Sequence, residues 1–378
     1  MVLDLARHPY FEPWTDPSSG VLSYLLVERV APLQQSFYFT NPGVSADGRW
    51  LWFYAAYPPS PQRMLAVVGL DPDEASIRVF HDTCFWSASP MVAPEGDAAC
   101  FCSRDAVWRK GLDGSIERLC RLPAEMKADV RGRLTHLGTH LTLSADGKHF
   151  LLDGRIGNQW FVALGDPRGG GVEVLHTFQR HYNHAQFSPT DPELFMIAQD
   201  WWVDPDSCVY HGLHHRIWLM DTRGRRFEPL RPTDWYARTA KGSHEWWSAD
   251  GWVCWTDYER GAHECRPDGG EPTLIWPGPL CHTHCDPTRR YFCADQSPYQ
   301  WPARPCEVRF FDRQAGREVH VVTAMPPPPI DRKGYHIDPH PQFSPCGGLV
   351  VYTTTVRGRV DVAVAPVEGI LDRLGAGG

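Results

Sequence analysis

Residues 340–345 read HPQFSP and residues 184–189 read HAQFSP, so the chain spells nearly the same hexapeptide twice. Both copies belong to a longer pattern, His-x-x-x-Ser-Pro/Ala-Asp-Gly, which occurs seven times with substitutions. The copies begin at residues 41, 89, 140, 184, 244, 282 and 340, at spacings of 38 to 60 residues. A repeat of this length indicates a propeller or a solenoid, in which each unit buries its apolar face against the next.

Each unit contains several strand-like runs. After the first motif come WLWFYAAY from residue 50, MLAVVGLD from residue 64 and SIRVFHD from residue 76, rich in β-branched and aromatic residues and separated by turn residues. With the motif as the innermost strand, a unit supplies four strands. The last unit lacks a fourth strand, whereas an unpaired GVLSYLLVERV stands at residues 20–30. The sequence therefore predicts an all-β fold: a seven-bladed β-propeller of four-stranded blades, closed by the N-terminal strand and forming one domain over residues 1–378.

Helix signals are scarce, and the best candidate is residues 122–134.

Composition excludes several classes of partner. The formal net charge is −8, and the Lys and Arg residues form no run, which argues against nucleic acid. No apolar stretch is long enough for a membrane span, and the N-terminal residues do not resemble a signal peptide, so we expect a cytoplasmic protein. The 12 Cys include no CxxC pair and are expected to be reduced thiols. The oligomeric state, monomer or homo-oligomer, stays open.

The first residue of each motif is expected to face the central channel, because the motif opens the innermost strand. Five consecutive units have His in this slot, whereas a purely structural requirement would also place His in the first two. A strand returns to the same face after two residues, so the third position is expected beside the first. The first-slot residues are Asn41, Ser89, His140, His184, His244, His282 and His340, and the third-position residues are Gly43, Met91, Thr142, Gln186, Trp246, His284 and Gln342.

Loops that join strands two and three are expected to reach the same mouth of the channel. Their polar and aromatic residues form a second set of candidates: Asp153, Arg155, Asn158, Gln159, Asp200, Trp201, Trp202, His214, His215, Arg216, Asp257, Tyr258, Arg260, Asp295 and Gln296.

A divalent metal site is expected on the last two units. Neutral imidazoles suit Zn, Mn, Fe or Ni, and an amide oxygen suits a harder ion such as Mn. Replacement of one ligand by Cys281 or Cys285 would favour Zn. The cofactor prediction is therefore Mn or Zn, with ligands drawn from His282, His284, His336, His340 and Gln342.

The chain has no Gly-rich phosphate loop, no nucleophile elbow and no repeated carboxylate pair, which disfavours NTPases, esterases and glycosidases. His, Arg and a metal fit proton abstraction beside a carboxylate, and on a uronic acid the result is β-elimination. The expected partner is an acidic oligosaccharide. The candidate base is His244, His184 or His140, with the metal or Arg216 holding the carboxylate and Tyr258 or Tyr210 as acid. The candidate binding residues are Asn41, Gln186, Arg155, Trp202 and Trp246.

SHEWWSADG, HTH and HPQFSP on seven repeated units together resemble the oligogalacturonate lyases, seven-bladed propellers that cleave pectin fragments with a bound divalent metal, usually manganese. The resemblance implies that His244 is the base, and that His282 or His284 holds the metal together with His340, Gln342 and His336. The family's last ligand group resembles Gln-x-x-His-x-His, whereas this chain has HIDPHPQ at residues 336–342.

The propeller-type ulvan lyases are a second resemblance, carried by THLTLSADG around His140 and by HHRIW around Arg216. This family uses inner-strand His residues with a Tyr and an Arg. Here Trp160 replaces the second His expected after GN. Two further alternatives are a non-catalytic propeller that binds a glycan or a protein, and a metal-dependent hydrolase or isomerase on the same scaffold.

Overall fold

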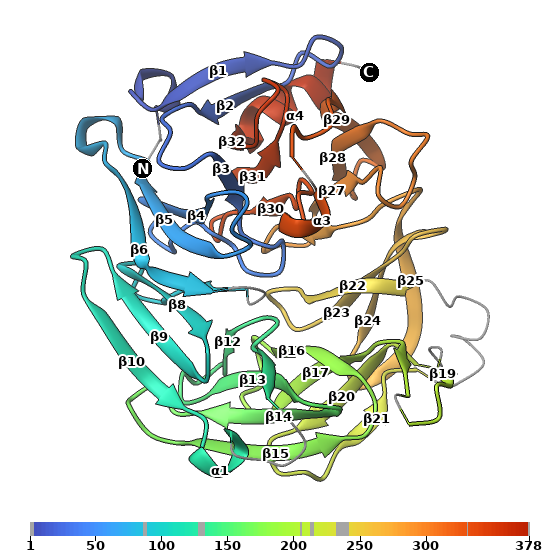
Figure 1. Cartoon of the computed structure of the whole chain (residues 1–378). Coiled ribbons are helices and arrows are strands. Elements are labelled where there is room, and N and C mark those ends of the chain that lie inside the picture. Colours follow the sequence, from blue (N-terminus) through green and yellow to red (C-terminus); the bar gives the residue numbers. More distant parts are fainter. Residues whose placement is uncertain are drawn as a thin grey trace.

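Seven antiparallel sheets surround a central axis in the computed structural model, which describes residues 4–85, 89–127, 133–204, 206–211, 215–231, 242–330 and 332–376 (Figure 1). The chain is a seven-bladed β-propeller, as its repeat predicts. Blades one to three contain β3 (Leu33–Ser36), β4 (Trp50–Ala56), β5 (Arg63–Gly69) and β6 (Ile77–Phe85); β7 (Met91–Val92), β8 (Ala98–Ser103), β9 (Ala106–Gly111) and β10 (Ile116–Arg121); and β11 (Leu134–Leu137), β12 (Thr142–Leu143), β13 (Phe150–Ile156), β14 (Gln159–Gly165) and β15 (Val172–Phe178).

Blades four to six have the same order from the axis outward. They contain β16 (Tyr182–Phe187), β17 (Leu194–Gln199), β20 (Ile217–Asp221) and β21 (Phe227–Pro229); β22 (Gly242–Trp247), β23 (Val253–Asp257), β24 (Gly261–Arg266) and β25 (Gly269–Pro277); and β26 (Thr283–Cys285), β27 (Tyr291–Gln296), β28 (Cys306–Asp312) and β29 (Arg317–Met325). Blade four also carries a two-stranded excursion, β18 (Trp202–Val203) with β19 (Tyr210–His211).

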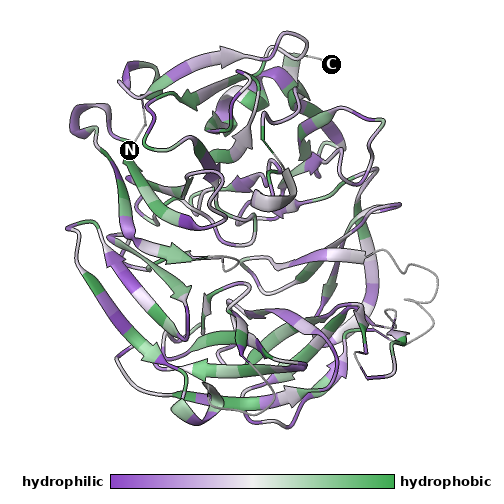
Figure 2. Ribbon diagram, in the orientation of Figure 1, coloured by the Kyte–Doolittle hydropathy of each residue, from purple (hydrophilic) through white to green (hydrophobic). Residues whose placement is uncertain are grey.

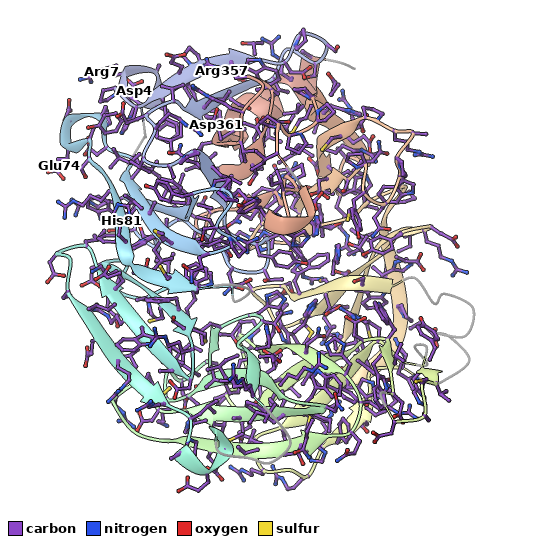
Figure 3. All side chains as sticks on the ribbon, viewed as in Figure 1. Asp4, Arg7, Glu74, His81, Arg357 and Asp361 are labelled. Carbon is purple, nitrogen blue, oxygen red and sulfur yellow. The ribbon has the colours of Figure 1, made fainter. Side chains whose placement is uncertain are left out.

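The seventh blade joins the two ends of the chain. Its inner strands are β30 (Gln342–Phe343), β31 (Leu349–Thr354) and β32 (Asp361–Pro366), and β2 (Leu22–Leu26) then pairs with β32. Thus an N-terminal strand closes the ring, as predicted. A fifth strand, β1 (Phe11–Thr15), adds to the outer edge. Asp361, labelled in Figure 3, accepts a hydrogen bond from Arg29 across this closure.

Helices are short in the described part of the chain. They are the 3-10 helices η1 (Leu5–Arg7) and η2 (Pro72–Glu74) and the α-helices α1 (Ala124–Lys127), α3 (Arg332–Tyr335) and α4 (Val367–Ala376). The expected helix at 122–134 begins as α1, and residues 128–132 lie outside the described residues. None of these helices has the length and apolar character needed to span a bilayer.

Large apolar side chains lie between neighbouring blades, where each sheet packs against the next. Much of the strand ribbon in Figure 2 has the green colour of hydrophobic residues. Trp52, Trp246, Trp255 and Trp276 are almost completely buried. Burial of one such side chain stabilises the fold by roughly 2 to 3 kcal/mol, so these four tryptophans have a structural role.

The end of the repeated motif forms the turn from strand one to strand two. In the first copy Ser45 donates a hydrogen bond to Asp47, and Gly48 has a φ of +73°. The third copy repeats this with Ser144, Asp146 and Gly147. Because a left-handed backbone favours Gly, the Ser-x-Asp-Gly tail is explained by turn geometry alone.

Candidate active site

A cavity of about 290 Å³ opens at one mouth of the central channel. Four of the five first-slot histidines line it, together with residues from blades one to five and blade seven. The lining residues are Gln35, Ser36, Tyr38, Tyr54, Arg63, Ser89, Thr139, His140, His184, Asp200, Arg216, Ser243, His244, His336 and His340. His282 lies directly behind them, with its ring centroid 4.1 Å from that of His244 and 4.2 Å from that of His340. The structure therefore brings all five histidines together.

Part of blade one crosses the channel below this cavity. Ser36 pairs with Phe53, and the next bridge joins Val44 to Leu51, so residues 37–42 protrude from the inner strand. The ring of Tyr38 stacks on His140 of blade three at a centroid distance of 5.1 Å. The same ring lies 5.5 Å from His282 of blade six and 4.8 Å from His340 of blade seven. Tyr38 thus occupies the centre of the histidine ring.

Three of the first-slot histidines have a left-handed backbone: φ is +56° at His184, +54° at His244 and +44° at His340. In blade five Ser243 pairs with Thr256, and Trp246 pairs with Cys254. Two residues, 244 and 245, therefore lie opposite the single residue 255. This is a β-bulge, and it moves every later residue of the strand to the opposite face. Non-Gly residues rarely adopt this conformation, and such strain is commonly found at functional sites.

The bulge directs Glu245 towards the site, where it forms a buried charge network. The Arg216 guanidinium donates to both carboxylate oxygens of Glu245 at 3.1 Å and also pairs with Asp200 at 3.3 Å. His184 Nδ1 lies 3.0 Å from Glu245 Oε1. The same Nδ1 lies 3.2 Å from Arg216 Nη2, so His184 contacts both members of the Arg216–Glu245 ion pair.

This network stabilises the charged forms of Glu245 and Arg216. Burial alone would raise the pKa of Glu245, but the Arg216 charge and the His184 hydrogen bond lower it far below the usual range. Burial likewise opposes the charge of Arg216, and Glu245 and Asp200 outweigh it, so the pKa of Arg216 is raised. Arg216 therefore has two carboxylate partners, in contrast to the prediction that it holds a substrate carboxylate.

His244 has both ring nitrogens engaged. Nδ1 lies 3.1 Å from the backbone oxygen of Cys281, which only accepts, so Nδ1 is protonated. Nε2 therefore accepts the hydrogen bond of the Tyr258 hydroxyl, at 2.9 Å. Burial, and next the neighbouring His282, lower the pKa of His244 well below its ordinary value. The imidazole is therefore neutral, and its lone pair on Nε2 is held against the Tyr258 hydroxyl.

A group of three histidines is able to hold a metal ion. One ring nitrogen from each of His282, His336 and His340 lies within 4.8 Å of the others. Two imidazole nitrogens on one tetrahedral zinc ion lie roughly 3.3 Å apart, so the rings would have to rotate to complete the site. His340 Nε2 is buried and has no hydrogen-bond partner among the described residues. Asp295 accepts from His282 Nδ1 at 2.9 Å, which leaves Nε2 as the ligand atom, the usual carboxylate–His–metal arrangement.

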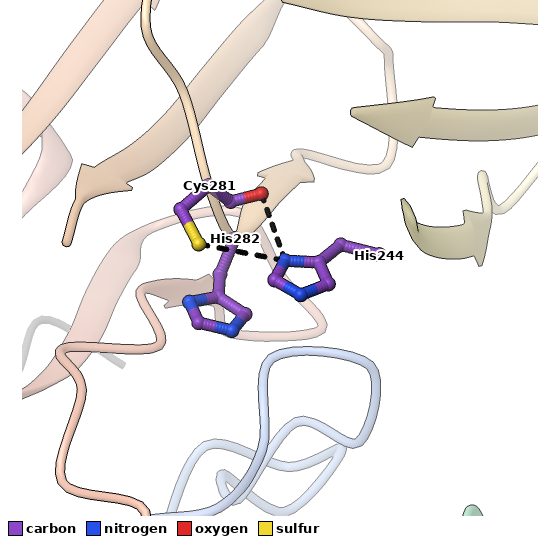
Figure 4. Close-up of side chains that lie close together, drawn as sticks. All are labelled: His244, Cys281 and His282. Carbon is purple, nitrogen blue, oxygen red and sulfur yellow. Dashed lines mark hydrogen bonds between the residues drawn. The ribbon is translucent and has the colours of Figure 1, made fainter. Parts of the chain in front are cut away.

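A second group, His244, Cys281 and His282, has ligand atoms equally close together (Figure 4). Figure 4 shows His244 Nδ1 directed at both the carbonyl oxygen and the Sγ of Cys281. Metal binding here would break one of the hydrogen bonds of His244, because its Nε2 is already paired with Tyr258. The three-histidine group fits a metal better, because His340 Nε2 is buried with no hydrogen bond to another described residue.

Two predicted metal ligands lie elsewhere. A strand advances about 3.3 Å per residue, so His284 is displaced along the axis by roughly 7 Å from His282. Its Nδ1 accepts from the Phe343 amide, and it lines a separate pocket of about 500 Å³ at the other end of the channel. The Gln342 side chain accepts from Gly43 and donates to Phe37, which anchors the crossing segment. The prediction of His284 and Gln342 as partners of the three histidines is therefore wrong.

Three predicted binding residues are also placed away from the cavity. Asn41 belongs to the crossing segment but lines the pocket at the other end of the channel, and its amide donates to the Leu141 carbonyl at 2.9 Å. Gln186 donates to the backbone oxygen of Glu245, and its side chain is 3% exposed. Trp246 is 1% exposed and packs in the core between blades five and six. The bulges at His184 and His244 explain the positions of Gln186 and Trp246. Each bulge moves the later residues of its strand to the opposite face, whereas the prediction assumed regular alternation.

The candidates on the loops between strands two and three also divide into residues that line the cavity and residues that do not. Asp200 and Arg216 line the cavity, whereas Arg155 lies over the Trp160 ring at 4.9 Å and Trp202 stacks on His211. Neither Arg155 nor Trp202 lines the cavity. His214 lies outside the described residues. Tyr210, the alternative acid, is exposed and stacks on a neighbouring tryptophan.

Sequence reasoning missed Tyr38, Arg63 and Glu245. Tyr38 precedes its motif by three residues, and Arg63 begins the third strand of blade one, so neither stands in a repeated slot. Glu245 follows His244 directly, and only a broken strand alternation would have placed it in the site.

No family model and no curated protein matches the chain. Solved structures do. A structure described as an oligogalacturonate lyase in complex with manganese has 16% identity and a TM-score of 0.73, over 94% of this chain and 96% of that one. An oligogalacturonate lyase from Vibrio parahaemolyticus has 15% identity and a TM-score of 0.75, over the same shares. The chain shares the fold of oligogalacturonate lyases.

A propeller of another class is less similar. The β-propeller domain of Cps50 (Swd1) from Myceliophteria thermophila has 11% identity and a TM-score of 0.55, over 87% of this chain and 96% of that one. At these identities the likeness establishes the seven-bladed fold and leaves the chemistry to the residues of the site.

Proposed function

We propose that this protein is a lyase that cleaves uronic-acid-containing oligosaccharides by β-elimination. The observation that carries the proposal is the His244–Tyr258 pair: a half-buried neutral imidazole whose Nε2 is the lone-pair atom, hydrogen-bonded to a phenol beside the cavity. Such a pair supplies both a base and an acid at one position, as the elimination requires.

In the proposed reaction His244 Nε2 removes the proton from C5 of the uronate. The C4–O4 bond breaks as the C4–C5 double bond forms, and the leaving oxygen receives a proton from Tyr258. Burial, the largest influence on Tyr258, raises its pKa above the ordinary value, so the hydroxyl is protonated at neutral pH and is able to donate. His184, oriented by Glu245, is the second candidate base.

His282, His336 and His340 would hold the metal, with Asp295 orienting His282. Neutral imidazoles accept both Mn and Zn, and the manganese in one similar structure favours Mn. A bound divalent cation supplies Lewis acidity, which stabilises negative charge developing on a substrate carboxylate. Metal analysis of the purified protein tests this assignment.

Sugar stereochemistry separates possible substrates. In a glucuronate residue the C5 proton and O4 lie on the same ring face, so one hydrogen-bonded pair is able to serve both. In a galacturonate residue they lie on opposite faces, and the acid must then come from another group than the partner of His244. The proposal therefore includes both sugars as candidates and assigns Tyr258 as acid only for same-face elimination.

The test is ultraviolet absorbance of the conjugated unsaturated uronate after metal-loaded protein is mixed with oligogalacturonate, ulvan or glucuronate-containing oligosaccharides. The matched variant is His244→Asn, because Asn tolerates the left-handed backbone but provides no base. We expect kcat to fall by about 10²- to 10⁴-fold. New reducing ends without absorbance would indicate a hydrolase instead, and no reaction with any uronide would contradict the proposal.

A further inference from the structure

Arg63, the first residue of β5, reaches the cavity from blade one. Its guanidinium carbon lies 4.9 Å from the centroid of the Tyr54 ring, and Nη2 donates to the backbone oxygen of Tyr335 at 2.5 Å. An aromatic face and a carbonyl orient the cation but do not neutralise it. Most of its five N–H donors are therefore available to a ligand.

The two arginines of the cavity differ in their partners. Arg216 is paired with Glu245 and Asp200, whereas Arg63 forms no ion pair with a carboxylate in the described part of the chain. Asp200 is the one carboxylate among the residues that line the cavity, and Arg216 holds it. Burial is the main influence on Arg63 and lowers its pKa. A partly buried cation without a counterion is costly, and a bound anion would offset that cost.

Arg63 also lies beside the three-histidine group. The carbonyl that accepts from Arg63 belongs to Tyr335, the residue before His336, and both Arg63 and His340 line the cavity. Gln35, Ser36 and Tyr54 line the same part of the cavity and are neutral hydrogen-bonding groups. This end of the cavity therefore combines a cation with neutral polar groups, and the one acid that lines the cavity, Asp200, is paired with Arg216. Such a lining suits a sugar that carries one carboxylate.

We propose that Arg63 binds the carboxylate of the uronate that is cleaved; this inference rests on the proposed lyase function. A guanidinium matches a carboxylate with two parallel hydrogen bonds, which adds orientation to charge. Carboxylate recognition thus moves from Arg216, as expected from sequence, to Arg63. Neutralisation of the carboxylate by Arg63 also makes the C5 proton more acidic, so the same contact serves binding and reaction.

The experiment is calorimetric binding of galacturonate and glucuronate to the metal-loaded protein, compared with the neutral sugars galactose and glucose. In Arg63→Gln we expect both uronates to bind about 10- to 100-fold more weakly, with neutral sugars unchanged. Arg63→Lys keeps the charge without the paired hydrogen bonds and should fall between. The matched control is Arg266→Gln, because Arg266 lies over the Trp252 ring at 4.8 Å, is exposed and lines none of the cavity.

Metal affinity is measured on the same variants, because Arg63 contacts the residue before His336. Retained metal affinity with lost uronate binding supports the inference, and loss of both would assign Arg63 a structural role and overturn it. Uronate binding that is equal in Arg63→Gln and the unmodified protein would also overturn it, while elimination of oligosaccharides by the unmodified protein would leave the lyase proposal standing. Failure of the unmodified protein both to bind and to cleave uronates would reject the two together.

Discussion

Asp295 is the carboxylate whose replacement by Asn tests the metal assignment most directly. Its Oδ1 accepts from the His282 backbone amide at 2.9 Å. Its Oδ2 accepts from His282 Nδ1 at 2.9 Å and from the His340 backbone amide at 3.1 Å. One carboxylate thus positions two of the three predicted ligands, without being a ligand itself.

Asp295→Asn leaves one acceptor oxygen where there were two. In either orientation the new NH2 faces a backbone N–H, of His282 or of His340, so one buried donor loses its partner at a cost of about 1 to 3 kcal/mol. With NH2 at the Oδ2 position, His282 is also driven to the tautomer whose Nε2 is protonated and unable to bind metal. Loss of such a supporting carboxylate weakens metal binding about 10- to 100-fold, or roughly 1.4 to 2.7 kcal/mol.

The assay is calorimetric titration of the metal-free protein with Mn²⁺ and with Zn²⁺, paired with urea unfolding. The control is Asp153→Asn: Asp153 is equally buried on β13 and accepts from the Thr139 amide at 2.7 Å, but it contacts none of the three histidines. Both variants should lose stability, and only Asp295→Asn should lose metal affinity. An Asp295→Asn protein that is folded and binds metal as tightly as the unmodified one would refute the assignment.

Three further outcomes follow from the site. Burial lowers the pKa of His140 well below 6.5. As pH falls, the unfolded chain therefore binds a proton at His140 before the folded chain does. The contribution of His140 to the free energy of unfolding is constant above about pH 6.5 and falls by about 1.4 kcal/mol per pH unit below it. Urea unfolding of His140→Gln at pH 7 and pH 5.5 should show a slope smaller by about that amount, and an equal slope would disprove it. Glu245→Gln breaks a buried ion pair with Arg216 and should cost about 3 kcal/mol in urea unfolding, whereas a loss below about 1 kcal/mol would show that the other carboxylate partner suffices. Tyr258→Phe should lower kcat on glucuronate substrates by about 10²-fold or more and on galacturonate substrates much less, and equal effects on the two sugars would reject same-face elimination.

The repeat made the fold predictable from sequence. Seven copies of one turn motif, with strand-like runs between them, are compatible with few architectures, and the unpaired strand before the first copy indicated how the ring closes. The fifth strand β1 and the helix α4 were not predicted, because they follow no repeat. Convergence of the five histidines was also predictable, because equivalent slots of a ring face one axis.

The inner contacts of the site were not predictable by alternation. A left-handed residue such as His244 shifts the strand by one position, which buries Trp246 and brings in Glu245. Nothing in a local pattern indicates that residues 37–42 leave their strand. The partners of the two arginines were also not predictable. Arg63 and Arg216 each stand at the start of a third strand, and only the fold shows that Arg216 is paired with a carboxylate and Arg63 with a carbonyl.

The segment 37–42 also divides the central channel of the propeller. Tyr38 lines the histidine cavity, whereas Thr40, Asn41 and Pro42 line the pocket at the opposite end. The segment thus separates the two pockets at the two ends of the channel. Under the proposed lyase function, an oligosaccharide bound in the histidine cavity would enter and leave on the same side of this segment.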